Sequence, residues 1–142
     1  MKRIVVNASV VLAGLFKDGT VRDILLTFED AEFVAPQYLR SEVERHLPEI
    51  VARSGKSEAT LRAVLEDLLS AIDLLPVEMY SNSLERAREI ARRADAKGDE
   101  DYLAMALALD APVWTLDKDF TRASGVRALR TSEVERSHGS AP

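Results

Sequence analysis

Apolar and polar positions alternate along the chain in a way that predicts strands separated by helices. Short apolar runs typical of buried strands occur at residues 3–6, 32–35, 74–77, 112–115 and 126–129. Elsewhere, apolar residues recur at helical spacing, which predicts helices over residues 7–16, 20–29, 37–54, 57–72, 83–94 and 99–109, and a last one from residue 131. Pro48 either kinks the third of these helices or starts a new one. The alternation is typical of an α/β fold with a mainly parallel, buried sheet.

The size and composition of the chain fit a single domain. Its 142 residues, of which 46% are hydrophobic, suffice for one core. We expect one domain over residues 1–136 and a flexible C-terminal tail over residues 137–142. The absence of cysteine excludes disulfides and thiolate metal sites. Because no run approaches the ~18 apolar residues of a membrane helix, we expect a soluble, cytoplasmic protein with no membrane partner.

Polar side chains follow the expected strands at the places where a parallel sheet binds its ligands. Asn7 interrupts an apolar run directly after the first strand, and Asp117 and Asp119 follow the fourth. Asp99 opens the helix that leads into the fourth strand. Glu42 lies at the edge of the apolar stripe of its helix, where a side chain can reach a cleft beside the sheet. Ligands bind beyond the carboxyl ends of parallel strands, so these residues are candidates for one site.

Each candidate also has an ordinary structural interpretation. Asp99 can cap its helix, and Asp117 and Asp119 can be turn residues. Glu42 can be a solvated helix residue, and Asn7 can stabilise a strand-to-helix turn. Position in the fold favours the shared site, because the ends of the first and fourth strands meet at the same edge of the sheet.

A cluster of carboxylates needs a cation or a change in protonation. Two such charges at about 4 Å repel by about 4 kcal/mol at an effective dielectric of about 20. Oxygen ligands without histidine or cysteine suit Mg²⁺ or Mn²⁺ better than Zn²⁺. A divalent ion held in this way, with open positions for water and phosphate, is what phosphodiester hydrolysis needs. The net charge of −5 argues against a protein that coats duplex DNA but is compatible with a nuclease.

Three stretches taken together resemble a PIN domain: IVVNASVVLAGLF, APQYLRSEVERH and GDEDYLAMALALDAPVWTLDKDF. The resemblance covers most of the chain, from Ile4 to Leu129, and is closest to bacterial and archaeal PIN proteins, the group that includes VapC-type toxins. It implies a three-layer α/β sandwich with helices flanking the sheet. It also implies a nuclease that depends on Mg²⁺ or Mn²⁺ and acts mostly on RNA.

The resemblance assigns roles to the acidic candidates. It implies that Glu42, Asp99 and Asp117 are the catalytic acids and that they bind the metal together with Asn7. Asp119 falls at a further acidic position that some family members use, so we include it among the metal ligands.

Four further residues are candidates for contacting the substrate. Ser9 matches the polar residue two positions after the first acidic position of the family, and Thr115 matches the small hydroxyl residue before the later acids. Lys118 and Arg122 lie next to the acids and are candidates for contacting phosphate by position alone.

Asn7 is where the chain departs from the family, which has aspartate at this position. Asparagine keeps the shape and one carbonyl oxygen but removes a negative charge from a direct metal ligand. The substitution is either engineered, to silence a toxic nuclease, or a natural change toward a weak or inactive site. We expect impaired metal binding, and the alternative function is a non-catalytic PIN domain that binds RNA or a protein.

Partners follow from the same resemblance. PIN proteins of this type are often homodimers, and some bind an antitoxin, so we expect a homodimer and a possible antitoxin partner besides the RNA substrate. His46 lies four residues after Glu42, a spacing that would let both reach one ion. Its position within the apolar face of the helix instead favours a packed or half-buried histidine.

Overall fold

A computed structural model gives the fold and describes residues 2–16, 19–95, 98–122 and 125–137. Its centre is a sheet of five parallel strands in the order β3-β2-β1-β4-β5. The strands are β1 (Lys2–Val6), β2 (Ala31–Pro36), β3 (Asp73–Leu75), β4 (Val113–Trp114) and β5 (Ala128–Leu129). The mainly parallel sheet expected from the sequence is therefore confirmed.

The central strand β1 is apolar because both of its faces are covered. Val5 pairs with Val34 of β2 on one side and with Val113 of β4 on the other. All three of these valines are fully buried. A parallel strand in this position shows a continuous apolar run rather than an alternating one, which is the pattern in the sequence.

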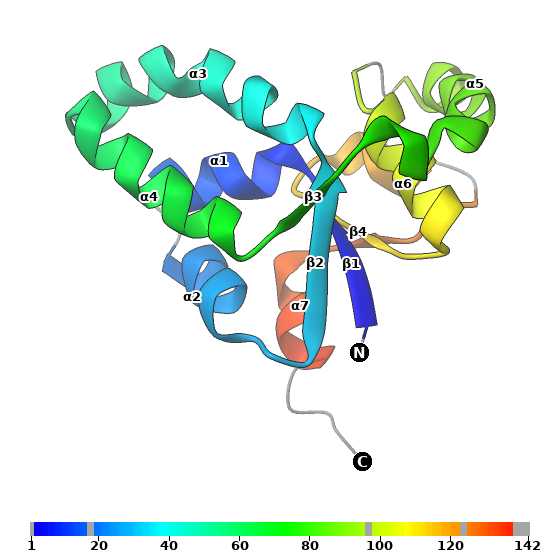
Figure 1. Cartoon of the computed structure of the whole chain (residues 1–142), viewed down its shortest axis with the longest axis horizontal. Helices are drawn as coiled ribbons and strands as arrows, with labels where there is room; N and C mark the ends of the chain where they lie inside the picture. The colour runs from blue at the N-terminus through cyan, green and yellow to red at the C-terminus, as the bar shows by residue number, and fades with distance from the viewer. Residues whose placement is uncertain (1, 17–18, 96–97, 123–124, 138–142) are drawn as a thin grey trace.

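Helices cover both faces of the sheet and make it the middle of three layers (Figure 1). On one side lie α1 (Ala8–Phe16), α2 (Gly19–Thr27), α3 (Tyr38–Ser54) and α4 (Glu58–Ser70). On the other side lie α5 (Leu84–Ala94) and α6 (Glu100–Leu109), and α6 packs against β1, β2 and β4. The helix α7 (Thr131–Ser137) follows β5. Short 3-10 turns complete the chain: η1 (Val77–Met79), η2 (Ser81–Ser83) and η3 (Lys118–Arg122).

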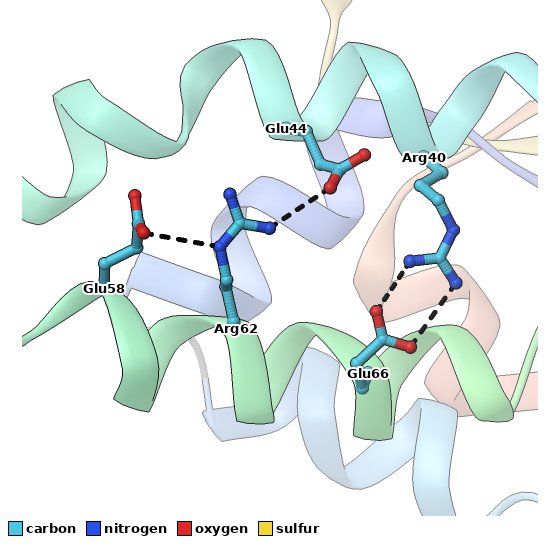
Figure 2. Close-up of polar contacts among 5 residues, drawn as sticks. All are labelled: Arg40, Glu44, Glu58, Arg62 and Glu66. Atoms are coloured by element: carbon cyan, nitrogen blue, oxygen red, sulfur yellow. Dashed lines mark hydrogen bonds and ion pairs between the residues drawn. The ribbon is translucent and has the colours of Figure 1, made fainter.

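The helices α3 and α4 pack against each other, and on their exposed sides each carries acidic and basic residues that form ion pairs (Figure 2). Arg40 of α3 lies 2.6 Å from Glu66 of α4. Arg62 of α4 lies 3.2 Å from Glu44 of α3 and 3.6 Å from Glu58 of its own helix. We call these five residues the α3–α4 ion-pair cluster. Beneath it the apolar side of α4 is buried within this one chain, through Leu61, Leu65, Leu68 and Leu69.

Some boundaries differ from those expected from the sequence. The helix α3 continues through Pro48, so no new helix begins there. The third, fourth and fifth strands are shorter than expected, and Val77 belongs to η1. Ser137 is the last residue of α7, and residues 138–142 of the predicted tail lie outside the described residues. None of the helices in the described part of the chain is long and apolar enough to cross a membrane.

Candidate active site

The predicted site residues lie around the carboxyl ends of β1, β2 and β4. Asn7 connects β1 to α1, and its backbone N–H donates to the carbonyl of Trp114 at the end of β4 (3.0 Å). Asp117 follows β4, and Glu42 lies in the early part of α3, which follows β2. Asp99 directly precedes α6, which packs against all three strands. The topology thus brings together residues that are far apart in the sequence.

Asn7 is buried and uses both ends of its side-chain amide. Only 4% of the residue is exposed. Its Oδ1 accepts a hydrogen bond from the backbone N–H of Ser9 (3.0 Å). Its Nδ2 donates to Oδ1 of Asp99 (3.3 Å). Asn7 therefore stabilises the strand-to-helix turn and also contacts the acidic residues.

Asp99 occupies the N-cap position of α6, but its side chain makes no capping hydrogen bond. It faces Asn7 instead, so helix capping does not account for this residue. Burial raises the pKa of Asp99 to about 7, and the Asn7 hydrogen bond opposes that shift. The negative charges of Asp117 and Glu42 raise the pKa further. These three carboxylates, which we call the acid centre, are thus close enough to interact electrostatically.

Glu42 is positioned by a buried tyrosine that is not among the residues predicted from the sequence. The hydroxyl of Tyr102 donates to Oε1 of Glu42 (2.7 Å), and Tyr102 is fully buried. This contact joins α6 to α3 across the site. Burial, followed by the charge of Glu42, raises the pKa of the Tyr102 hydroxyl above its ordinary value, so it remains a proton donor.

A second tyrosine explains why Asp101 is not part of the acid centre. The hydroxyl of Tyr80, which lies between η1 and η2, donates to Oδ2 of Asp101 (2.6 Å). Both tyrosines are buried as core aromatics are, and no motif in the sequence marks either hydroxyl as a partner of a carboxylate. The polar role of each hydroxyl depends on a partner that is distant in sequence.

Hydroxyl groups hold the turn that carries Asp117. The hydroxyl oxygens of Ser9 and Thr115 lie 3.4 Å apart. Ser9 Oγ accepts the backbone N–H of Leu116 (3.0 Å), and Thr115 Oγ1 accepts that of Asp117 (3.0 Å). Asp117 Oδ1 in turn accepts the N–H of Asp119 (2.9 Å), so Asp117 is a turn residue as well as a member of the acid centre.

The structure gives fewer contacts with the acid centre for the remaining candidates. Lys118 and Asp119 begin η3, directly after Asp117, while the side chain of Arg122 lies outside the described residues. His46 is half-buried rather than packed, one of the two states expected for it, because 49% of its side chain is exposed; its Nδ1 lies 4.0 Å from Glu49. His46 is one residue before the buried Leu47, so its side chain falls beside the apolar stripe of α3 rather than within it.

The chemistry of the donors fits a hard divalent cation, but their positions do not close around one. The candidate ligands are carboxylate and amide oxygens, which suit Mg²⁺ or Mn²⁺. Across the described residues, no three His, Asp or Glu side chains are arranged to hold a metal ion as they stand. Each carboxylate of the acid centre has one oxygen in a hydrogen bond, to Asn7, Tyr102 or the N–H of Asp119. Metal binding at this centre would require these side chains to reorient.

A family model described as PIN domain matches residues 5–138, which is nearly the whole chain. The chain belongs to the PIN domain family. No curated protein sequence matches it. The solved structures that resemble this PIN domain are distant in sequence, so they inform its fold alone.

Three solved structures illustrate the similarity of fold. VapBC2 from Rickettsia felis, bound to a DNA fragment from their promoter, matches with a TM-score of 0.70 and 13% identity over 90% of this chain and 98% of that one. DNA-bound VapBC from Salmonella typhimurium matches with a TM-score of 0.67 and 16% identity over 92% and 99%. PAE2754 from Pyrobaculum aerophilum matches with a TM-score of 0.67 and 17% identity over 95% and 88%.

Proposed function

We propose that this PIN domain is an endoribonuclease that depends on Mg²⁺ or Mn²⁺ and is impaired by Asn7. The observation that carries the proposal is the acid centre. Glu42 and Asp117 raise the pKa of Asp99 through their charges, and among the described residues no basic side chain contributes to that shift. A group of like charges at the carboxyl ends of parallel strands is suited to an external cation.

Roles for the residues follow from their positions. Glu42, Asp99 and Asp117 would hold the ion, with the carboxylate of Asp119 as a further ligand; the carbonyl oxygen of Asn7 could join them only if its amide rotated away from the Ser9 N–H. A divalent ion held by these residues would lower the pKa of the attacking water and offset negative charge on the phosphodiester. Ser9 and Thr115 fix the turn of Asp117, and Tyr102 orients Glu42. Lys118 and Arg122 are our candidates for binding the phosphates of the RNA.

Asn7 weakens such a centre in two ways. It lacks the negative charge that an aspartate would bring to the cation. It also donates a hydrogen bond to Asp99, which occupies a carboxylate oxygen that the cation needs. We therefore expect weak metal binding and slow cleavage by the chain with Asn7.

The test is the substitution Asn7→Asp. Cleavage of a labelled single-stranded RNA in Mg²⁺ should rise at least tenfold, since changing even an indirect partner of a metal site alters its function by about 10–100-fold. Calorimetric titration with Mn²⁺ should show tighter binding by Asn7→Asp than by the unchanged chain. Adding Asp117→Asn to Asn7→Asp is the control and should remove both gains. Equal cleavage and equal Mn²⁺ binding by the unchanged chain and by Asn7→Asp would refute the proposal.

A second candidate is a non-catalytic PIN domain that binds RNA or a protein. The Asn7–Asp99 hydrogen bond favours it, because this contact satisfies the acidic site without a metal. Under this alternative, Asn7→Asp would neither bind Mn²⁺ at millimolar concentration nor cleave RNA. The same titration thus separates the two functions.

The assembly that we propose is a toxin with an antitoxin partner. Two of the similar solved structures are VapBC complexes on DNA, and they share the fold of this chain over nearly its whole length. We also propose a cytoplasmic homodimer. Light scattering of the purified chain tests the dimer, and co-expression with the product of the adjacent gene tests the partner.

A further inference from the structure

A groove adjoins the acid centre on the side of β4 and β5. Its volume is about 380 Å³. One wall is the turn after β4, residues 115–118, and the other is β5 with the start of α7, residues 128–132. The two walls are held together by β-pairing, which continues into the hydrogen bond from the N–H of Thr115 to the carbonyl of Leu129 (3.1 Å). The groove therefore belongs to the rigid sheet and shares Asp117 with the acid centre.

The lining of the groove combines apolar side chains with two cations. Leu116, Ala128 and Leu129 supply the apolar surface. Leu116 is 46% exposed, so its side chain is accessible to a ligand in the groove. The cations are Lys118 and Arg130, one from each wall.

The conformation of Arg130 is set by α7, the helix that directly follows it. Its backbone N–H and its Nε both donate to Oε1 of Glu133, at 3.0 and 3.3 Å. The Arg130 side chain is nevertheless 76% exposed, so it remains accessible to a ligand in the groove.

We propose that this groove binds the nucleotide next to the scissile phosphodiester of a single-stranded RNA. The apolar surface would contact the base, and Arg130 would contact a phosphate. This inference rests on the proposed function for the position of the scissile bond, at Asp117. Since the contact that we propose for the base is apolar, the identity of the base should have little effect on it. A single unpaired nucleotide suits a groove of this volume, because a base in a duplex is stacked and paired and does not present its face.

The experiment measures the binding of a short fluorescent single-stranded RNA by anisotropy, in EDTA and again with Mg²⁺. The unchanged chain with Asn7 is used, so that binding is measured without appreciable cleavage. Arg130→Ala should weaken binding about fivefold. It should also reduce the slope of log affinity against log salt by about 0.7, the value for one lost phosphate contact on a single strand. Leu116→Ala should weaken binding about threefold and leave the salt slope unchanged, since the contact it removes is apolar.

The chain offers a matched control for each variant. Arg93 is 77% exposed and paired with a nearby glutamate, as Arg130 is, but it lies on α5 outside the groove. Leu26 is 51% exposed and lies on α2. Arg93→Ala and Leu26→Ala should each leave affinity within about twofold. Circular dichroism checks that all four variants are folded.

A second probe tests the contact with the base. An RNA whose nucleotides lack their bases should bind the unchanged chain more weakly than the normal RNA does. Leu116→Ala should have no further effect on that probe, whereas Arg130→Ala should still weaken its binding.

Any one of three results would refute the proposal that the groove binds RNA. The unchanged chain could bind no RNA in either buffer, or Arg130→Ala and Arg93→Ala could lose equal amounts of RNA affinity. The third such result is that Leu116→Ala has no effect on the affinity for the normal probe. The groove and the nuclease can fail separately. If Asn7→Asp cleaves RNA while the groove variants bind RNA normally, the proposed role of the groove is refuted and the proposed nuclease function is supported. If the groove variants lose RNA binding while Asn7→Asp fails to cleave RNA, the groove binds RNA as proposed and the proposed nuclease function is refuted.

Discussion

The acid centre and the α3–α4 ion-pair cluster are both groups of charged side chains, but their charges are arranged in opposite ways. On the outer side of α3 and α4, the Glu66 carboxylate accepts from Arg40, which lowers the pKa of Glu66. In the acid centre, Asp99 is partly buried and faces other carboxylates and an amide, and its pKa is raised. The fold thus pairs exposed carboxylates of α3 and α4 with arginines, whereas the described groups that act on Asp99 are other carboxylates and an amide.

The largest effect that this comparison predicts is on catalysis. In the Asn7→Asp form, Asp99→Asn should reduce Mg²⁺-dependent cleavage of RNA by at least about 100-fold, because it removes a direct metal ligand. Glu66→Gln in the same form should leave the rate unchanged, since Arg40 already neutralises that carboxylate. Initial rates with labelled RNA measure both. A comparable loss in the two variants would mean that the acid centre has no special role.

The next effect concerns stability as a function of pH. The folded chain raises the pKa of Asp99 to about 7 from 3.8, so the folded state binds this proton more tightly than the unfolded state does. Stability from this group is therefore fully present below about pH 4 and is lost as pH rises toward 7. Asp99→Asn should be about 1–2 kcal/mol more stable than the unchanged chain at pH 8, after a discount for the solvent access of Asp99, and equal to it near pH 4. Urea denaturation at the two pH values measures the difference, and a pH-independent difference would refute the assignment.

The two buried tyrosines provide a matched pair of variants, because each hydroxyl donates to a carboxylate but only that of Tyr102 contacts the acid centre. Tyr102→Phe and Tyr80→Phe each remove one hydroxyl that donates to a carboxylate, and each should cost about 1 kcal/mol of stability. In the Asn7→Asp form, only Tyr102→Phe should also weaken Mn²⁺ binding, by about tenfold, because it alone positions a ligand. Calorimetry and thermal melting measure the two quantities. Equal effects of both variants on Mn²⁺ affinity would show that Tyr102 has no positioning role.

The smallest effect should come from the α3–α4 ion-pair cluster. Its side chains are largely exposed, and exposed ion pairs contribute little and are screened by salt. Arg40→Gln should therefore shift the urea midpoint less than any variant above, and raising the salt concentration should remove the difference. A shift larger than that of Tyr102→Phe would show that the cluster stabilises the α3–α4 pair substantially.

The parts of the fold that the sequence predicts are those that local pattern determines. The apolar runs around Val5 and Val34 predict buried strands, and Ser57 predicts the start of α4, where its hydroxyl accepts the N–H of Thr60 (3.1 Å). Pattern alone could not decide the role of Pro48, because the burial of Leu47 and Ile50 on one side of α3 keeps the helix continuous. Tertiary packing settles such cases.

In the candidate site, too, some features could be predicted from the sequence and others depend on contacts between distant residues. Parallel-sheet topology and the family resemblance suffice to gather Asn7, Glu42, Asp99 and Asp117, and the geometry brings these residues near one another. The roles of Tyr102 and Tyr80 could not be predicted, because each depends on a hydrogen bond between residues that are distant in sequence. The half-buried state expected for His46 agrees with the structure, but its side chain lies beside the apolar face rather than within it, because a shift of one position on a helix moves a side chain by about 100° around its axis.

The turn at the start of α1 determines which end of the Asn7 amide faces the acidic residues. Its oxygen is held by the N–H of Ser9, so its nitrogen points at Asp99. Nitrogen in an amide carries hydrogens and no available lone pair, so it cannot coordinate a cation. Rotating the group by half a turn would present the oxygen but leave the Ser9 N–H facing a donor. An aspartate at this position escapes the conflict, because it can accept from Ser9 with one oxygen and offer the other to the metal.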